Sequence, residues 1–130
     1  MTEPERAEAC SSLTASVEKA QSCESAEMAV DILEQTLVAE QRKLPVLPQI
    51  TLSCFFVELG RQYNALGMHH LTTGATAEAL ATLQKAQTLS QADNTYIIAS
   101  DRLELRSITL NNLACIYKAL NKPHTALACL

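Results

Sequence analysis

Cysteine and histidine are the residue types in this chain that could act as nucleophiles or metal ligands. The five cysteines are scattered and form no Cys-x-x-Cys pair: Cys10, Cys23, Cys54, Cys115 and Cys129. A thiol nucleophile needs a base and an orienting group, and neither Cys54 nor Cys115 has a recognisable one in sequence. His69 and His70 are adjacent, so on a helix their side chains diverge by about 100°. We therefore expect reduced thiols, a packed His70, an exposed His69, and no catalytic residue, metal site or cofactor.

Two asparagines offer a different chemistry, which is hydrogen bonding to another polypeptide. Asn111 and Asn112 follow Leu110 in a segment with helical spacing. A primary amide donates and accepts at the same time, which suits the backbone of an extended peptide. The alternative is a solvated or locally bonded amide.

Composition favours helices as the elements that position these groups. Hydrophobic residues make up 48% of the 130 residues, and the chain has three glycines and four prolines. Val, Ile, Phe and Tyr show no alternating runs, which indicates an all-α chain. The formal net charge is −4, and no basic cluster occurs beyond Arg42-Lys43, so nucleic-acid binding is not expected. No apolar run approaches membrane-spanning length, and the acidic, polar start is unlike a secretory signal.

Start and stop signals divide the chain into six expected helices. Thr2 and Glu5 fit a capping box, and Ser22 or Ser25 caps the second helix, which Pro45 and Pro48 stop. The helices are expected at about 5–20, 25–43, 49–72, 76–90, 95–120 and from 123 onward. Short connections favour three antiparallel hairpins. The chain ends inside the sixth helix, which predicts that this sequence is the N-terminal fragment of a longer protein.

The last hairpin has a spacing that recurs upstream. Its pattern of small and large residues runs from Leu110 to Leu130 and falls in register with Tyr63 to Leu83. Gly67 and Ala114 would let the first helix of each pair approach the second closely, and they lie 47 residues apart. The residues expected to pack within and between repeats are Tyr63, Leu66, Gly67, Ala79, Leu83, Leu113, Ala114, Tyr117 and Ala126. Self-similarity at a fixed period indicates a helical repeat protein.

This pattern resembles the tetratricopeptide repeat (TPR), and the string 109–114 is similar to the long-repeat subtype of kinesin light chains. The repeat is longer than the usual 34 residues, and the additional length is expected as extended helices between Ser90 and Thr109. The chain departs from the family at Leu110, where an aromatic is usual, and at His70, where Tyr is usual. The resemblance implies a right-handed solenoid whose first helices line a concave groove. The groove residues that it implies are Asn64, Met68, Asn111, Asn112 and Cys115.

The expected organisation is one continuous domain. Residues 1–44 form an N-terminal hairpin, which is a degenerate repeat or a cap, and residues 49–130 form two TPR-like hairpins. The function implied is that of a non-enzymatic, cytoplasmic module that binds a peptide or helix of another protein. The alternative is a capping or self-association domain, possible as a homo-oligomer, in a larger cytoskeletal or ciliary scaffold.

Overall fold

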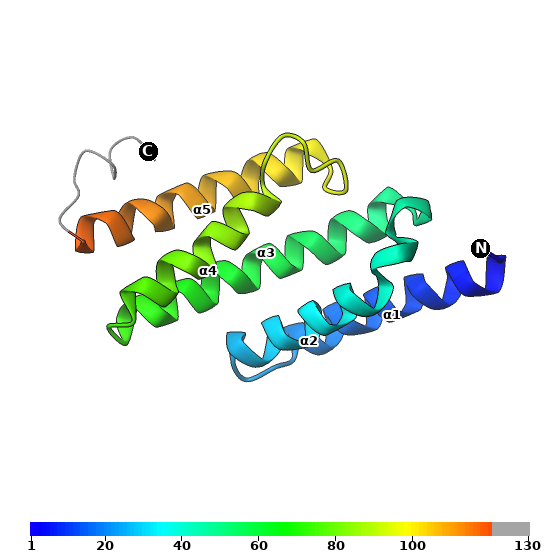
Figure 1. The fold of residues 1–130 in the computed structure, drawn as a ribbon, viewed down its shortest axis with the longest axis horizontal. Helices are drawn as coiled ribbons and strands as arrows, with labels where there is room; N and C mark the ends of the chain where they lie inside the picture. Colours follow the sequence, from blue (N-terminus) through cyan, green and yellow to red (C-terminus); the bar gives the residue numbers. More distant parts are fainter. Residues whose placement is uncertain (121–130) are drawn as a thin grey trace.

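The structure is a computed structural model that describes residues 1–120, and it is all-helical over that range (Figure 1). It contains five α-helices and one 3-10 helix: α1 (Glu3–Gln21), α2 (Ala26–Glu40), η1 (Gln41–Val46), α3 (Gln49–Thr72), α4 (Thr76–Leu89) and α5 (Ala99–Ala119). The predicted sixth helix, with Ala126, lies outside the described residues.

The helix boundaries follow the local capping chemistry. The Glu5 amide donates to Thr2 Oγ1 at 3.3 Å, and the Thr2 amide donates to Glu5 Oε2 at 3.4 Å, which completes the predicted capping box. Ser25, rather than Ser22, caps α2, because Ser25 Oγ accepts from the Met28 amide at 3.2 Å. Gly74 follows α3 with a φ of 83°, a left-handed conformation that glycine adopts without steric cost.

Two connections differ from the sequence prediction. Helix α2 ends at Glu40, and η1 replaces the expected linker around Pro45. Helix α5 begins at Ala99 instead of about Thr95, so residues 90–98 form a structured turn rather than an extended helix. Asn94 stabilises this turn, since its Nδ2 donates to the Leu89 carbonyl at 2.8 Å and its Oδ1 accepts from the Tyr96 amide at 3.2 Å. Part of the long spacing between repeats is therefore this turn.

The odd-numbered helices α1, α3 and α5 run parallel to one another, and α2 and α4 run in the opposite direction (Figure 1). Three successive contacts between α3 and α5 keep the same order along both helices: Ser53 with Asp101, Gly60 with Leu105, and Asn64 with Thr109. A Cβ atom on Gly60 would lie 2.6 Å from Leu105 Cδ2, so glycine permits the close approach of α3 to α5 at this point. Each consecutive pair of helices also packs side by side.

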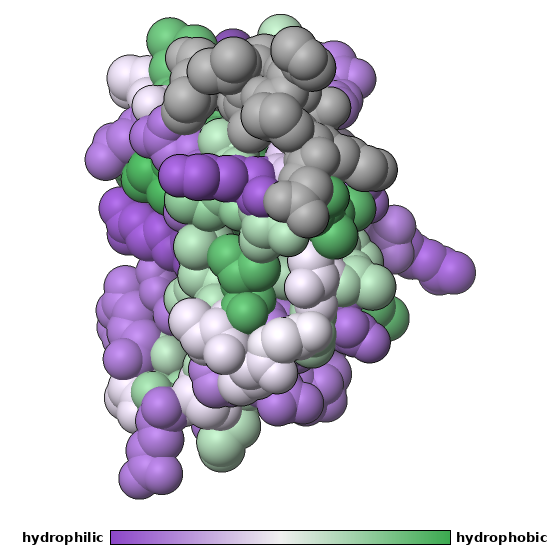
Figure 2. Space-filling view, turned by 90° about the vertical axis from the view of Figure 1, so that its left-hand side faces the viewer, coloured by the Kyte–Doolittle hydropathy of each residue, from purple (hydrophilic) through white to green (hydrophobic). Residues whose placement is uncertain are grey.

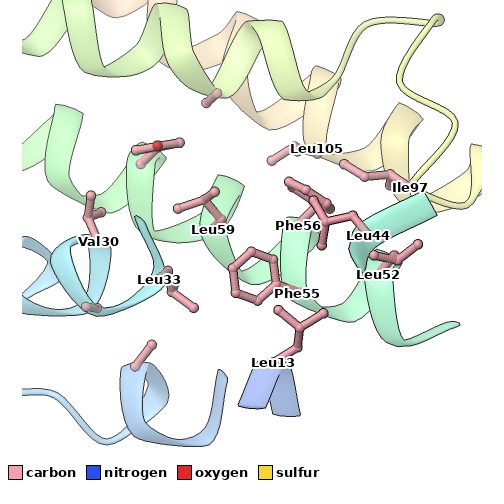
Figure 3. Packing of buried hydrophobic residues seen from close by; sticks show 14 of the residues in the cluster. Leu13, Val30, Leu33, Leu44, Leu52, Phe55, Phe56, Leu59, Ile97 and Leu105 are labelled. Carbon is pink, nitrogen blue, oxygen red and sulfur yellow. The ribbon is translucent and has the colours of Figure 1, made fainter. Parts of the chain in front are cut away.

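The larger of two hydrophobic clusters draws residues from every described helix, and it centres on α3. Phe55 is fully buried, and its ring lies between Leu13 of α1 and Leu33 of α2 (Figure 3). The neighbouring Phe56 faces another direction and stacks on Tyr96, with ring centroids 5.6 Å apart. Adjacent aromatic residues of α3 thus join the first hairpin to the turn that precedes α5.

A smaller cluster lies toward the end of the molecule where α3 turns into α4 and α5 ends. Its buried members are Ala79, Leu83, Leu113 and Ile116. Seen from this end, apolar surface runs through the middle of the molecule and hydrophilic surface lies along its edges (Figure 2). The second cluster joins α4 to α5, just as the first joins α2 to α3.

The residues that the repeat pattern assigned to packing lie mostly in the interior. Tyr63, Leu66, Gly67, Ala79, Leu83, Leu113 and Ala114 are buried, and Tyr117 is half-buried. A Cβ atom on Gly67 would come within 2.8 Å of Leu83 Cγ and Cδ2, so the absence of a side chain lets α3 approach α4. It is the contact between first and second helix for which the sequence analysis singled out Gly67.

Tyr63 also joins three helices through polar contacts. Its hydroxyl donates to Glu34 Oε2 of α2 at 2.6 Å, and Lys85 Nζ of α4 lies 3.4 Å from the same oxygen. Burial raises the pKa of the Tyr63 phenol well above its usual range, and the hydrogen bond to Glu34 and its negative charge raise it further.

We expect the stabilisation that Tyr63 provides to be lost at alkaline pH. The folded-state pKa of Tyr63 is raised above the unfolded value of about 10, so this stabilisation is fully present below pH ~10 and falls as the pH rises above it. Urea unfolding of wild type and Tyr63→Phe at a series of pH values tests this. Wild type should be more stable than Tyr63→Phe near neutrality, and this difference in unfolding free energy should shrink above pH ~10.

In a Glu34→Gln background the stabilisation by Tyr63 should fall less steeply at alkaline pH, but it should still fall, because burial is the largest cause of the raised Tyr63 pKa. A difference that stays constant to pH ~12 would contradict this account.

Candidate functional site

The strongest candidate for a binding surface is the face that α1, α3 and α5 share. Three adjoining hollows lie along it. The first lies between α1 and α3 and includes Ile50, the second is bordered by all three helices, and the third lies between α3 and α5 and includes Ile108. The first and second share Val17 and Cys54, so they are continuous. The second and third share Val57, Arg61 and Asp101. We call this surface the odd-helix groove.

Aliphatic side chains occur along the whole odd-helix groove. Val17 of α1 and Val57 of α3 are half-buried in it, while Ile50 and Ile108 remain 63% and 42% exposed. Cys54 adds an exposed thiol. Exposed aliphatic side chains that line one continuous groove are a feature of interaction surfaces, whereas scattered ones are ordinary.

Charged residues of the odd-helix groove are mostly acidic. Glu18 comes from α1, Glu58 from α3, and Asp101 and Glu104 from α5. Arg61 provides a positive charge, and its Nη1 lies 3.8 Å from Glu58 Oε2. The Arg61 side chain is 60% exposed and that of Glu58 is 6% exposed, so the pair has one buried and one solvated member.

Ser53 fixes the start of α5 against α3. Its hydroxyl is buried, donates to Asp101 Oδ2 at 3.2 Å and accepts from the Ile98 amide at 3.0 Å. Asp101 lies in the first turn of α5, where the helix dipole favours a carboxylate. These bonds hold the Asp101 side chain at the border between the second and third hollows.

Asn64 does not have the exposed position that the sequence predicted for a groove residue. It is 5% exposed, and its Nδ2 donates to the Gly60 carbonyl at 2.9 Å and to Thr109 Oγ1 at 3.0 Å. Asn112 Nδ2 donates to Asn64 Oδ1 at 2.9 Å. The two amides therefore satisfy each other in the seam between α3 and α5, because a buried amide without partners is costly.

The other predicted groove residues have different surroundings. Met68 is half-buried and packs on the second cluster, Asn112 is half-buried, and Asn111 and Cys115 are exposed. Asn111 makes no side-chain hydrogen bond to the described residues. Asn111 and Cys115 thus retain groups that a partner could contact.

The predicted groove residues lie on the same helical face as the odd-helix groove, but they are not the residues that line its hollows. Val57 and Arg61 lie seven residues before Asn64 and Met68, and Glu104 and Ile108 lie seven residues before Asn111 and Cys115. Seven residues are close to two helical turns, so both sets lie on the same stripe. The lining residues could have been found in the sequence by continuing this stripe toward the start of α3 and α5.

The cysteines and histidines among residues 1–120 form no common cluster, and Cys129 lies outside the described residues. Cys54 and Cys115 are exposed free thiols, and Cys10 and Cys23 are half-buried. His69 is exposed and His70 half-buried, with ring centroids 6.3 Å apart. Within residues 1–120, no three His, Cys, Asp or Glu side chains are arranged to hold a metal ion. Over the same range, none of the helices combines the length and apolar character needed to cross a membrane.

No protein-family model, curated protein or solved structure matched this chain. The odd-helix groove is therefore the feature of the described residues from which a function can be inferred.

Proposed function

We propose that this chain is a non-enzymatic protein-interaction module of TPR-like architecture, whose odd-helix groove binds a peptide or helix of a partner protein. The observation that carries the proposal is the continuity of the three hollows across α1, α3 and α5. Shared residues at both junctions make one elongated surface, which suits a polypeptide segment better than a compact ligand.

The arrangement of the helices supports this proposal. In a TPR-like solenoid the first helix of each hairpin lies beside the first helix of the next. Here α1 packs on α3 and α3 packs on α5, in addition to the packing of consecutive helices. The parallel order of α3 and α5 and the glycines at positions 60 and 67 agree with such a stack.

The outer face of the first hairpin supports its role as an end of the stack. A hollow between α1 and α2 is lined mainly by small and polar residues, which include Ser12, Lys19, Gln35 and Thr36. Terminal repeats of solenoids need a polar outer face, because no further repeat covers them. This surface is consistent with the cap expected for residues 1–44.

The dimensions of the odd-helix groove also favour a polypeptide ligand. Its three hollows have cavity volumes of about 310, 250 and 20 Å³. Pockets for small molecules and cofactors commonly enclose about 300–1,000 Å³ and bury most of the ligand. The first hollow only just reaches this range, and all three are open to solvent and joined in series, so they would bury little of a compact ligand and instead offer successive sites for side chains of one peptide.

Selection of peptide ligands followed by mapping tests the proposal. A phage-displayed library of random peptides of about 16 residues would be selected against the full chain, and ¹⁵N NMR would locate the binding of each selected peptide. We expect shift changes at Val57, Arg61 and Ile108. Ile108→Gln should weaken binding about tenfold, since it removes an aliphatic contact, whereas Leu103→Gln should change it less than about twofold.

Leu103 is a matched control because it is also on α5 and is 65% exposed, but it does not line the groove. Circular dichroism would establish that both variants fold. Failure to select any binding peptide would overturn the proposal. Peptides that map to α2 and α4, or equal weakening by both variants, would do the same.

A further inference from the structure

We propose that the partner segment is a basic amphipathic helix, with an aliphatic stripe flanked by Lys or Arg side chains. This inference rests on the proposed function of the odd-helix groove. It adds the chemistry of the ligand, which follows from how charge and apolar surface are distributed among α1, α3 and α5.

Negative charge is concentrated in the odd-helix groove. Its lining includes the carboxylates of Glu18, Glu58, Asp101 and Glu104, against the guanidinium of Arg61, which gives a formal charge of −3. The whole chain has a formal charge of −4. Most of the net charge therefore lies at this one surface, where it would attract a cationic segment and repel phosphate groups.

The positions of these groups match the profile of an amphipathic helix. Ile50, Cys54 and Val57 form an apolar stripe of α3, at spacings of four and three residues. Glu18 lies on the α1 side of this stripe, and Glu104 lies on the α5 side. A helix that placed its apolar stripe along α3 would thus meet carboxylates on both flanks.

Arg61 has the opposite charge to the carboxylates of the groove, so its replacement and theirs should change the affinity for a basic ligand in opposite directions. It is the positively charged residue of the lining and is paired with the buried Glu58, while its own side chain is largely exposed. A basic ligand would be repelled by Arg61 and attracted by Glu18 and Glu104. Removal of the positive charge should therefore strengthen binding, and removal of the exposed carboxylates should weaken it.

Two designed peptides test the inference on the full chain. Both have about 18 residues, the same helical apolar stripe of Leu and Ile, and flanks of either Lys and Arg or Glu. Fluorescence anisotropy should show that the basic peptide binds at least about tenfold more tightly than the acidic one. Its affinity should fall as NaCl rises from about 50 to about 500 mM, because the charges at the groove border are solvated.

Three variants separate the charge effect from damage to the fold. Glu18→Gln/Glu104→Gln should weaken the basic peptide about three- to tenfold, and Arg61→Gln should tighten it about two- to fivefold. Glu27→Gln/Glu78→Gln removes two exposed carboxylates of α2 and α4 and should change the affinity less than twofold. Loss of folding cannot produce the gain expected for Arg61→Gln.

The outcomes distinguish this inference from the proposed function. If the basic and acidic peptides bind the odd-helix groove equally, or if Arg61→Gln weakens the basic peptide, the inference is wrong and the proposed function stands. If neither peptide binds but library peptides of other composition map to the groove, the inference again fails alone. If no peptide of any kind binds the groove, both fail.

Discussion

Replacement of Phe55 by alanine should lower the free energy of unfolding by about 3–5 kcal/mol, which is the usual cost of removing a fully buried phenylalanine. Phe55 is 0% exposed and fills the space between Leu13 and Leu33 (Figure 3). Because domains of this size are stable by only about 5–15 kcal/mol, this loss would remove between about a fifth and all of the stability. Urea unfolding followed by circular dichroism at 222 nm measures the change.

Val38→Ala is the control for the Phe55 variant. Val38 is 75% exposed on α2, so its truncation should change stability by less than about 0.5 kcal/mol. Phe55→Leu should lie between the two, and it keeps the measurement possible if Phe55→Ala does not fold. A loss below about 1 kcal/mol for Phe55→Ala would mean that α3 does not join the two hairpins as described.

The elements that could be predicted from sequence are those whose ends carry a local signal. Helix α3 begins after Pro48 and ends just before Gly74, and both bounds were predicted because proline and glycine act through the backbone alone. The capping box of α1 is likewise complete within Thr2 and Glu5. Such signals need no knowledge of the partner helix.

The turn before α5 could not be predicted in the same way, because tertiary contacts determine it. Residues 95–98 have helical spacing in sequence, but Ile97 is 1% exposed and its neighbour Ile98 donates its amide to Ser53 of α3. Arg102 also donates to the carbonyls of Asn94 and Ile97, at 3.3 and 3.4 Å. Together with the contact between Ile98 and Ser53, which lie 45 residues apart in the chain, these bonds outweigh the local preference for helix.

The candidate site was predicted at the level of the helical face but not of the residue. The resemblance to the TPR implied which stripe of a first helix is free of its own hairpin, and the residues that it implied were Asn64, Met68, Asn111, Asn112 and Cys115. Which part of the stripe is covered depends on how far α5 overlaps α3. Because Asn64 meets Thr109 and Asn112, the stripe is closed there and opens about two turns earlier, at Val57 and Arg61.

We expect Asn64→Ala to destabilise the fold by about 1–3 kcal/mol, since it removes a buried side chain that makes three hydrogen bonds. Asn112→Ala should cost less, about 1 kcal/mol, because Asn112 is half-buried and water can replace part of its bonding. If the two amides bond to each other, the double variant should be more stable than the sum of the single losses predicts, by about 0.5–1 kcal/mol. Urea unfolding of the four proteins completes this double-mutant cycle.

Asn111 provides the matched control for this cycle, since it adjoins Asn112 on α5 but is exposed. Asn111→Ala should change stability by less than about 0.5 kcal/mol and should not couple to Asn64→Ala. Coupling to Asn111 but not to Asn112 would contradict the seam described between α3 and α5. It would also support the exposed position predicted for Asn64 from the sequence, because an amide that does not bond to Asn112 would be available to a peptide. The cycle thus decides whether Asn64 holds α5 against α3 or belongs to the binding surface.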